Sequence, residues 1–322
     1  MVPDEVYRRL LREVFGLTEE ELGLVEQSFS RVGVEGPTDE LAARLAQSTT
    51  VDAALVTLVR QQTDTVRLLD RRLGAPALLE QMRAHIATLQ GLVTHAVLDS
   101  TRRPIAAVLA DAATLAGWQA LDVGATAQAW GHFEVAKAAA REAGDAALLT
   151  HAKEEQAYAL LDVQRPADGV ALLQEARDEG ARALPARMVS WLWAAEAELL
   201  AAADDEMAFR RALDTAARLL PSHNHDPELP YLSLDDCHLA RWRGHSLARL
   251  GDREAIDHLS GALAQHDAQF TRARGSLLID LAKALTVSGE RGQAQVHIDA
   301  ARQLVAQTGS VRQRRRLREL AT

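Results

Sequence analysis

The sequence is poor in several residue types, and each shortage excludes a class of structure. Its 322 residues include a single cysteine, Cys237, so no internal disulfide can form, and a reducing cytoplasm is the expected compartment. Aromatic residues make up only 4%, and strand-forming residues are scarce beside Ala, Leu, Arg and Glu. This composition favours helices nearly throughout the chain.

Several functional signals are also missing. No apolar run approaches the roughly 18 residues that a membrane span needs, and the charged, amphipathic start is not a signal peptide. The net charge of −9 disfavours non-specific binding to nucleic acid. Neither a Walker A sequence nor a G-x-G-x-x-G motif is present. We therefore expect a cytoplasmic protein that is not an enzyme, binds no cofactor and does not enter a membrane.

Two segments resemble chemical sites superficially. Residues 244–248, "GHSLA", approach the hydrolase nucleophile elbow, but Ser246 falls in the middle of an expected helix rather than after a strand. Residues 219–236 form a polar stretch whose histidines precede Cys237 and His238, yet the spacing of paired zinc ligands is absent. We expect a solvated loop with a half-buried Cys237, and no metal site.

What the sequence does contain is a repeat. A small residue recurs at intervals of about 40, and seven residues after each one lies a glycine or polar residue typical of a turn. The small residues are Gly117, Ala157, Ala197, Gly244 and Ala282, and the turn residues are Gly124, Gln164, Asp204, Gly251 and Gly289.

Each turn is followed by a small-large-small ladder at i, i+4 and i+7, which is the spacing of one helix face. The ladders are Ala129/Phe133/Ala136, Gly169/Leu173/Ala176, Phe209/Leu213/Ala216, Ala255/Leu259/Ala262 and Ala294/Ile298/Ala301. The pattern resembles the tetratricopeptide repeat with longer helices. Because one helix pair cannot bury such a face alone, stacked pairs are required. The sequence predicts an all-α, right-handed helical solenoid with extra N-terminal helices.

The expected organisation has four parts. Residues 1–36 form linker or dimerisation helices, with a Thr18/Glu21 capping box. Residues 37–103 are helical and lead into the repeats, which occupy 104–309. Residues 310–322 are a basic C-terminal helix or tail, and two interpretations are open: a capping helix with a solvated basic face, or a phosphate-binding segment.

Three segments carry a more specific resemblance: "YRRLLREVFGLTEEELGL", "LAGWQALDVGATAQAWGHFEVAKAAAREAGD" and "LPYLSLDDCHLARWRGHSLARLGD". They resemble the helix-turn-helix/tetratricopeptide transcriptional regulators of high-GC Gram-positive bacteria. In that family a DNA-binding domain precedes the first of these segments, and no such pattern precedes it here. Either that domain has been left off or this is a natural short relative. The resemblance implies a homodimer, and DNA contact only through the absent domain.

The first helix of each repeat lines the concave groove in such folds, so its inward positions are candidate ligand contacts. We expect aromatic and charged side chains to form a mixed binding surface there, with a positive patch around Arg241. The candidates are Asp111, Thr114, Trp118 and Leu121; His151, Glu154 and Tyr158; Trp191 and Glu198; His238, Arg241 and His245; and Lys283. The alternative is that these aromatic residues only pack between repeats.

Two functions fit these features. The first is a ligand-sensing module of a transcriptional regulator, which binds a short peptide or a small acidic and apolar metabolite in the groove. Related regulators clamp peptides with groove asparagines, and the single asparagine here, Asn224, lies in a loop, so the class of ligand stays open. The second is a non-enzymatic protein-interaction scaffold.

Overall fold

The structure is a computed structural model, and it describes residues 37–180, 183–222, 226, 229–267 and 270–320. Within these ranges it contains fourteen α-helices, one short 3-10 helix and no strand, which confirms the all-α prediction. The chain divides into two units, residues 1–43 and 44–322. Of the first unit only residues 37–43 are described, and the two helices predicted before residue 36 lie outside the described residues.

Several helices precede the repeats. They are α2 (Pro37–Thr49), α3 (Ala53–Leu73), the 3-10 helix η1 (Ala75–Ala77) and α4 (Leu79–His95). Asp52 caps α3 by accepting a hydrogen bond from the backbone N–H of Leu55 at 2.7 Å.

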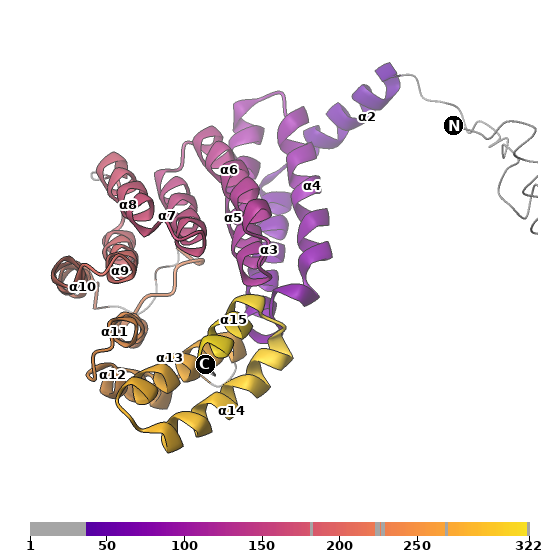
Figure 1. The fold of residues 1–322 in the computed structure, drawn as a ribbon. Coiled ribbons are helices and arrows are strands. Elements are labelled where there is room, and N and C mark those ends of the chain that lie inside the picture. Colours follow the sequence, from indigo (N-terminus) through magenta and orange to yellow (C-terminus); the bar gives the residue numbers. More distant parts are fainter. Residues whose placement is uncertain (1–36, 181–182, 223–225, 227–228, 268–269, 321–322) are drawn as a thin grey trace, which may run out of the picture. The chain divides into compact units, whose positions relative to one another are not determined.

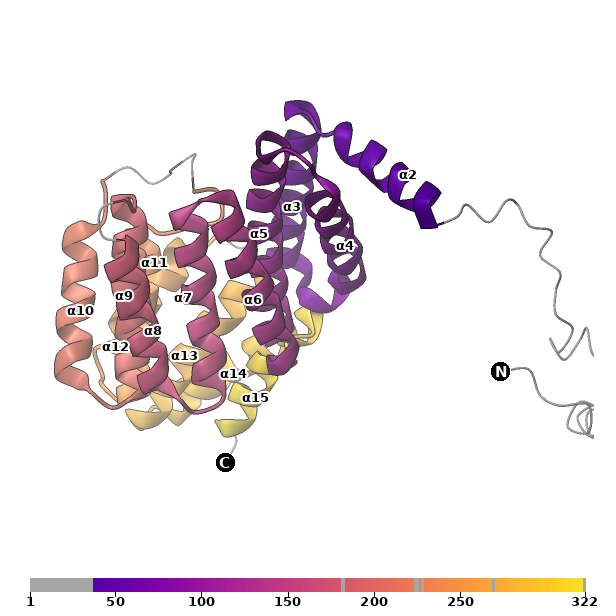
Figure 2. The same cartoon turned by 90° about the horizontal axis from the view of Figure 1, so that it is seen from above.

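Five helix pairs follow, stacked in sequence order around a common interior (Figure 1 and Figure 2). The first helix of each pair faces the interior and the second forms the outer layer. The pairs are α5 (Asp99–Asp122) with α6 (Thr126–Ala143), α7 (Ala146–Asp162) with α8 (Pro166–Gly180), α9 (Ala186–Ala202) with α10 (Glu206–Leu219), α11 (Asp236–Leu250) with α12 (Ala255–Gln265), and α13 (Thr271–Val287) with α14 (Arg291–Thr308).

The packing within pairs follows from the repeat pattern. Every ladder residue is buried, and so are the five small residues. A Cβ on Gly117 would overlap the ring of Phe133, and one on Gly244 would lie 2.6 Å from Leu259 Cγ. All five turn residues have positive φ, including the non-glycines Gln164 (61°) and Asp204 (59°). Close helix crossing and a left-handed turn therefore define each pair.

The last helix closes the superhelix on its beginning. Helix α15 (Val311–Glu319) contacts α5, α13 and α14, and α3 contacts α13 and α14 (Figure 1). Ser310 Oγ donates a hydrogen bond to Asp122 Oδ1 at 2.6 Å, and Arg272 Nη1 lies 2.6 Å from Asp70 Oδ2. The repeats therefore surround an interior space instead of forming an open groove.

Two expectations about individual segments need correction. The loop of residues 220–235 is not simply solvated, because Leu229, Leu232 and Leu234 are buried in the core of the later repeats. Helix α5 is long and apolar enough to cross a membrane by composition alone, although no such run was expected. Of its most apolar stretch 83% is buried inside the protein, as befits the central helix of a packed fold.

Candidate ligand-binding site

The interior space is a cavity of about 1030 Å³, large enough for a metabolite or a short peptide. Residues of α3, α5, α7, α9, α11, α13 and α15 line it. The chain as a whole carries −9, yet the lining is balanced. Its nine basic residues are Arg67, Arg71, Arg241, Arg249, Arg272, Lys283, Arg312, Arg315 and Arg316, and its nine acidic residues are Asp70, Asp111, Asp122, Glu155, Asp162, Glu198, Asp204, Asp280 and Glu319.

Most of the sequence-predicted positions meet in this cavity. Those that line it are Asp111, Thr114, Trp118, His151, Tyr158, Trp191, Glu198, His238, Arg241, His245 and Lys283. Two do not. Leu121 is 1% exposed and packs in an apolar cluster with Phe133, and Glu154 is fully buried behind the lining.

The aromatic wall is built around Trp118. Its ring meets that of Tyr158 edge-on, with centroids 6.0 Å apart. The guanidinium groups of Arg272 and Arg312 lie 5.5 and 5.4 Å from the Trp118 centroid, so cation–π contacts hold this ring in place. On the other side Trp191 meets Trp242 at 4.9 Å.

The positive patch predicted around Arg241 differs from the prediction in its two histidines, His238 and His245. His238 Nδ1 lies 2.7 Å from Asp235 Oδ1, and burial together with Arg241 lowers the pKa of His238. His245 lies between Asp280 Oδ1 at 2.8 Å and Glu198 Oε1 at 3.2 Å. Burial alone would lower the pKa of His245, but the two carboxylates outweigh it and raise this pKa to about 9. The positive charge of His245 is therefore neutralised by its neighbours.

Arg241 and Arg71 are two of the lining cations that have no ion pair among the described residues; Lys283 and Arg249 are the others. Arg241 and Arg71 are half-buried in the cavity wall, and burial lowers the pKa of each. Arg241 also lowers the pKa of Arg71, which places the two guanidinium groups within electrostatic reach of each other. In the part of the chain that the structure describes, neither forms an ion pair or hydrogen bond, and the guanidinium group of Arg71 lies 5.5 Å from the centroid of the Phe270 ring. Asp70, the acidic neighbour of Arg71, forms its ion pair with Arg272.

Part of the cavity lining comes from outside the repeats and was not predicted from the sequence. Arg71 belongs to α3, which precedes the repeats, and Arg312, Arg315 and Arg316 belong to α15, which follows them. Arg315 and Arg312 pair with Asp162, and Arg316 pairs with Asp280. The arginines of the C-terminal helix thus include three that face the interior. The spacing of Arg312, Arg315 and Arg316 at i, i+3 and i+4, which places them on one face of a helix, was the signal available in the sequence.

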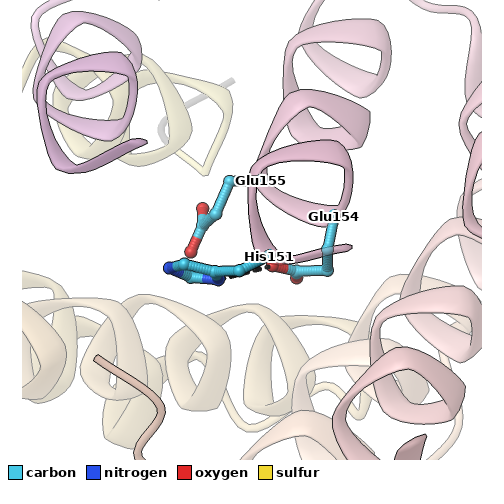
Figure 3. Close-up of side chains that lie close together, drawn as sticks. All are labelled: His151, Glu154 and Glu155. Carbon is cyan, nitrogen blue, oxygen red and sulfur yellow. Dashed lines mark ion pairs between the residues drawn. The ribbon is translucent and has the colours of Figure 1, made fainter. Parts of the chain in front are cut away.

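A second missed feature is a compact polar cluster on α7, formed by His151, Glu154 and Glu155 (Figure 3). One donor atom from each lies within 4.8 Å of the others. Sequence analysis predicted no metal site, and it considered metal only near residues 223–238. Of that region, His223 and His225 lie outside the described residues, and Cys237 is half-buried. Ser246 is buried within α11, as expected for a packing residue.

Comparison with known proteins adds little to this geometry. No family model matches the chain, and no curated protein matches it. Two similar solved structures are of a Podosopora anserina protein classed as a kinesin light chain with nearly identical TPR-like repeats, one of them a point variant. They are 15% identical, with TM-scores of 0.40 and 0.39, over 61% of this chain and 94% of theirs. The five helix pairs of the structure itself establish the tetratricopeptide-like repeat fold.

Proposed function

We propose that this protein is a ligand-binding regulatory module whose interior cavity holds a small anionic molecule with an apolar part. One observation carries the proposal: Arg241 and Arg71 face the cavity without a carboxylate partner among the described residues. Charged groups withdrawn from water are normally paired. A carboxylate or phosphate of a ligand would pair with both guanidinium groups, which favour bidentate contacts.

The surroundings of these arginines support the same class of ligand. The carboxylates that act electrostatically on Arg241, those of Asp280 and Glu198, already pair with His245. Phe270, Trp191 and Trp242 line the same cavity and would contact the apolar part. Because the two sides of the superhelix meet, a ligand between them would favour the closed arrangement over an open one.

The regulatory output and the dimer come from the family resemblance and stay proposals. A regulator that reads a two-fold symmetric operator is usually a dimer. Light scattering at tens of micromolar tests this: we expect twice the 35.0 kDa chain mass, and a monomer would contradict it.

Native mass spectrometry of the purified chain tests the ligand. We expect a second species, heavier than the free chain by the mass of one small molecule, that persists through gel filtration. Arg241→Ala should lose this species, whereas Arg302→Ala, an exposed arginine on α14, should keep it. A mass gain equal in both variants would contradict binding at Arg241.

The repeat fold itself favours a second function, a non-enzymatic interaction scaffold, because stacked helix pairs present extended binding surfaces. With α15 packed against α5, such a partner would contact the outer helices α6, α8 and α10. Crosslinks from a co-purified protein to those helices, with binding unchanged in Arg241→Ala, would favour the scaffold over the ligand module.

A further inference from the structure

The cluster on α7 is unusual because four of its buried polar atoms form no hydrogen bond. His151 Nδ1, both carboxylate oxygens of Glu154 and Oε2 of Glu155 are buried and without a hydrogen bond in the structure. Glu154 is 0% exposed and His151 is 6% exposed. Buried polar groups are normally satisfied, and a buried carboxylate left unpaired is strongly unfavourable. Four such atoms in one place make the cluster a candidate site for a bound group.

The geometry identifies what this group must be. Positions i, i+3 and i+4 lie on one face of a helix, so the three side chains converge, with His151 Nδ1 3.8 Å from Glu154 Oε2 (Figure 3). The order here, His before Glu, is the reverse of the Glu-x-x-His motif with which helix bundles hold iron or manganese, so the inference rests on the convergence of the three side chains alone. One imidazole nitrogen with carboxylate oxygens suits a divalent transition metal, whereas calcium and magnesium prefer oxygen ligands alone.

We propose that His151, Glu154 and Glu155 bind one divalent transition-metal ion. The ion would neutralise the two carboxylates and satisfy the orphaned atoms together. His151 and Glu155 also line the cavity, so water from the cavity completes the coordination.

A neighbouring aromatic ring holds the imidazole of His151 in one orientation. Tyr231 stacks on the His151 ring with centroids 4.5 Å apart and the planes inclined by 19°, which fixes the imidazole.

Neither carboxylate of the cluster has a cation of its own among the described residues. Burial raises the pKa of Glu154 well above its usual range, and the nearby indole N–H of Trp191 offsets only part of this rise. Burial likewise raises the pKa of Glu155 to about 7; the nearest cations, Arg272 and Arg312, form no ion pair with it.

Zinc binding to the full chain, freed of metal with a chelator, tests the proposal. We expect calorimetry to give one Zn²⁺ per chain, and Co²⁺ to give visible d–d absorption bands when it takes the same site. His151→Gln and Glu154→Gln should each weaken the affinity at least about tenfold, since even outer-shell substitutions have effects of that size. His297→Gln, a histidine on α14 outside the cluster, is the matched control and should bind as the natural chain does.

Two controls separate loss of metal binding from loss of folding and from loss of the anion site. Glu154→Gln keeps the size and polarity of the buried side chain and removes only its ionisable group, so circular dichroism should show a folded protein, and only its metal-dependent rise in Tm should disappear. Arg241→Ala should still bind Zn²⁺, which separates this site from the proposed anion site. Absence of stoichiometric Zn²⁺ binding, or equal affinity in the natural chain and both cluster variants, would overturn the proposal.

Discussion

At the scale of single residues, opposite charges in the interior neutralise one another. Asp280 accepts from His245 Nδ1 and pairs with Arg316. Burial would raise the pKa of Asp280, but these two cations outweigh it and lower this pKa to about 2. The pKa of His245 is raised to about 9 by the same contacts. Each group therefore stabilises the folded state while it is charged.

The pairing of His245 with Asp280 makes the free energy of unfolding depend on pH in a defined direction. Because the pKa of His245 rises on folding, its contribution is complete below the unfolded value near 6.5 and is lost as the pH rises through about 9. His245→Gln should therefore reduce the free energy of unfolding at pH 6 by on the order of 3 kcal/mol, and by much less at pH 10.

Urea unfolding at the two pH values measures this difference. His258→Gln on α12 serves as the control, and it should show no such dependence. A deficit for His245→Gln that is as large at pH 10 as at pH 6 would mean that His245 is uncharged in the folded protein.

At the scale of helices, the sequence pattern predicted the pairs because each pair is specified locally. Gly117 and Phe133 are 16 residues apart, and their contact needs only one turn between two helices. The turn residue seven positions after the small residue has positive φ in all five repeats. In two repeats, at Gln164 and Asp204, a side chain occupies this left-handed conformation, which is unfavourable for L-residues.

The turns therefore offer a pair of substitutions with opposite effects. Gln164→Gly should raise the free energy of unfolding by about 0.5–1 kcal/mol, because the relief of strain exceeds the entropy lost by glycine. Gly289→Gln should lower it by about 1–2 kcal/mol, since a Cβ there meets no atom within 4 Å and only the backbone conformation opposes it. Chemical denaturation measures both. A loss of stability in Gln164→Gly would show that the turn is held by side-chain contacts.

At the scale of the whole repeat unit, the contact between the two ends of the superhelix could not be predicted from the sequence. Ser310 and Asp122 are 188 residues apart, and no periodicity connects them. For the same reason the predicted lining was incomplete: most of the predicted inward positions line the cavity, Leu121 and Glu154 do not, and Arg71 and the arginines of α15 enter only because the two ends meet. The cluster of His151, Glu154 and Glu155 on α7 could not be predicted, because the sequence shows residue types but not whether their buried atoms have hydrogen-bond partners.

Closure itself can be tested by removing the last helix. Deletion of residues 310–322 removes the hydrogen bond from Ser310 to Asp122 and the pairing of Arg315 with Asp162. We expect small-angle scattering to show a larger radius of gyration, and hydrogen exchange to accelerate in α3 and α13. Unchanged scattering would mean that contacts between α3 and α13 hold the ends together without α15.

The most direct test of the central claim, an interior site for an anionic ligand, is a thermal-shift comparison of matched probes. Indole-3-acetate, indole-3-acetamide and tryptamine share one apolar group and differ in charge. We predict that millimolar indole-3-acetate raises the Tm of the natural chain and that the neutral and cationic analogues do not, with the effect lost in Arg241→Ala and kept in Arg302→Ala. Equal shifts from all three probes, or an undiminished shift in Arg241→Ala, would contradict the account.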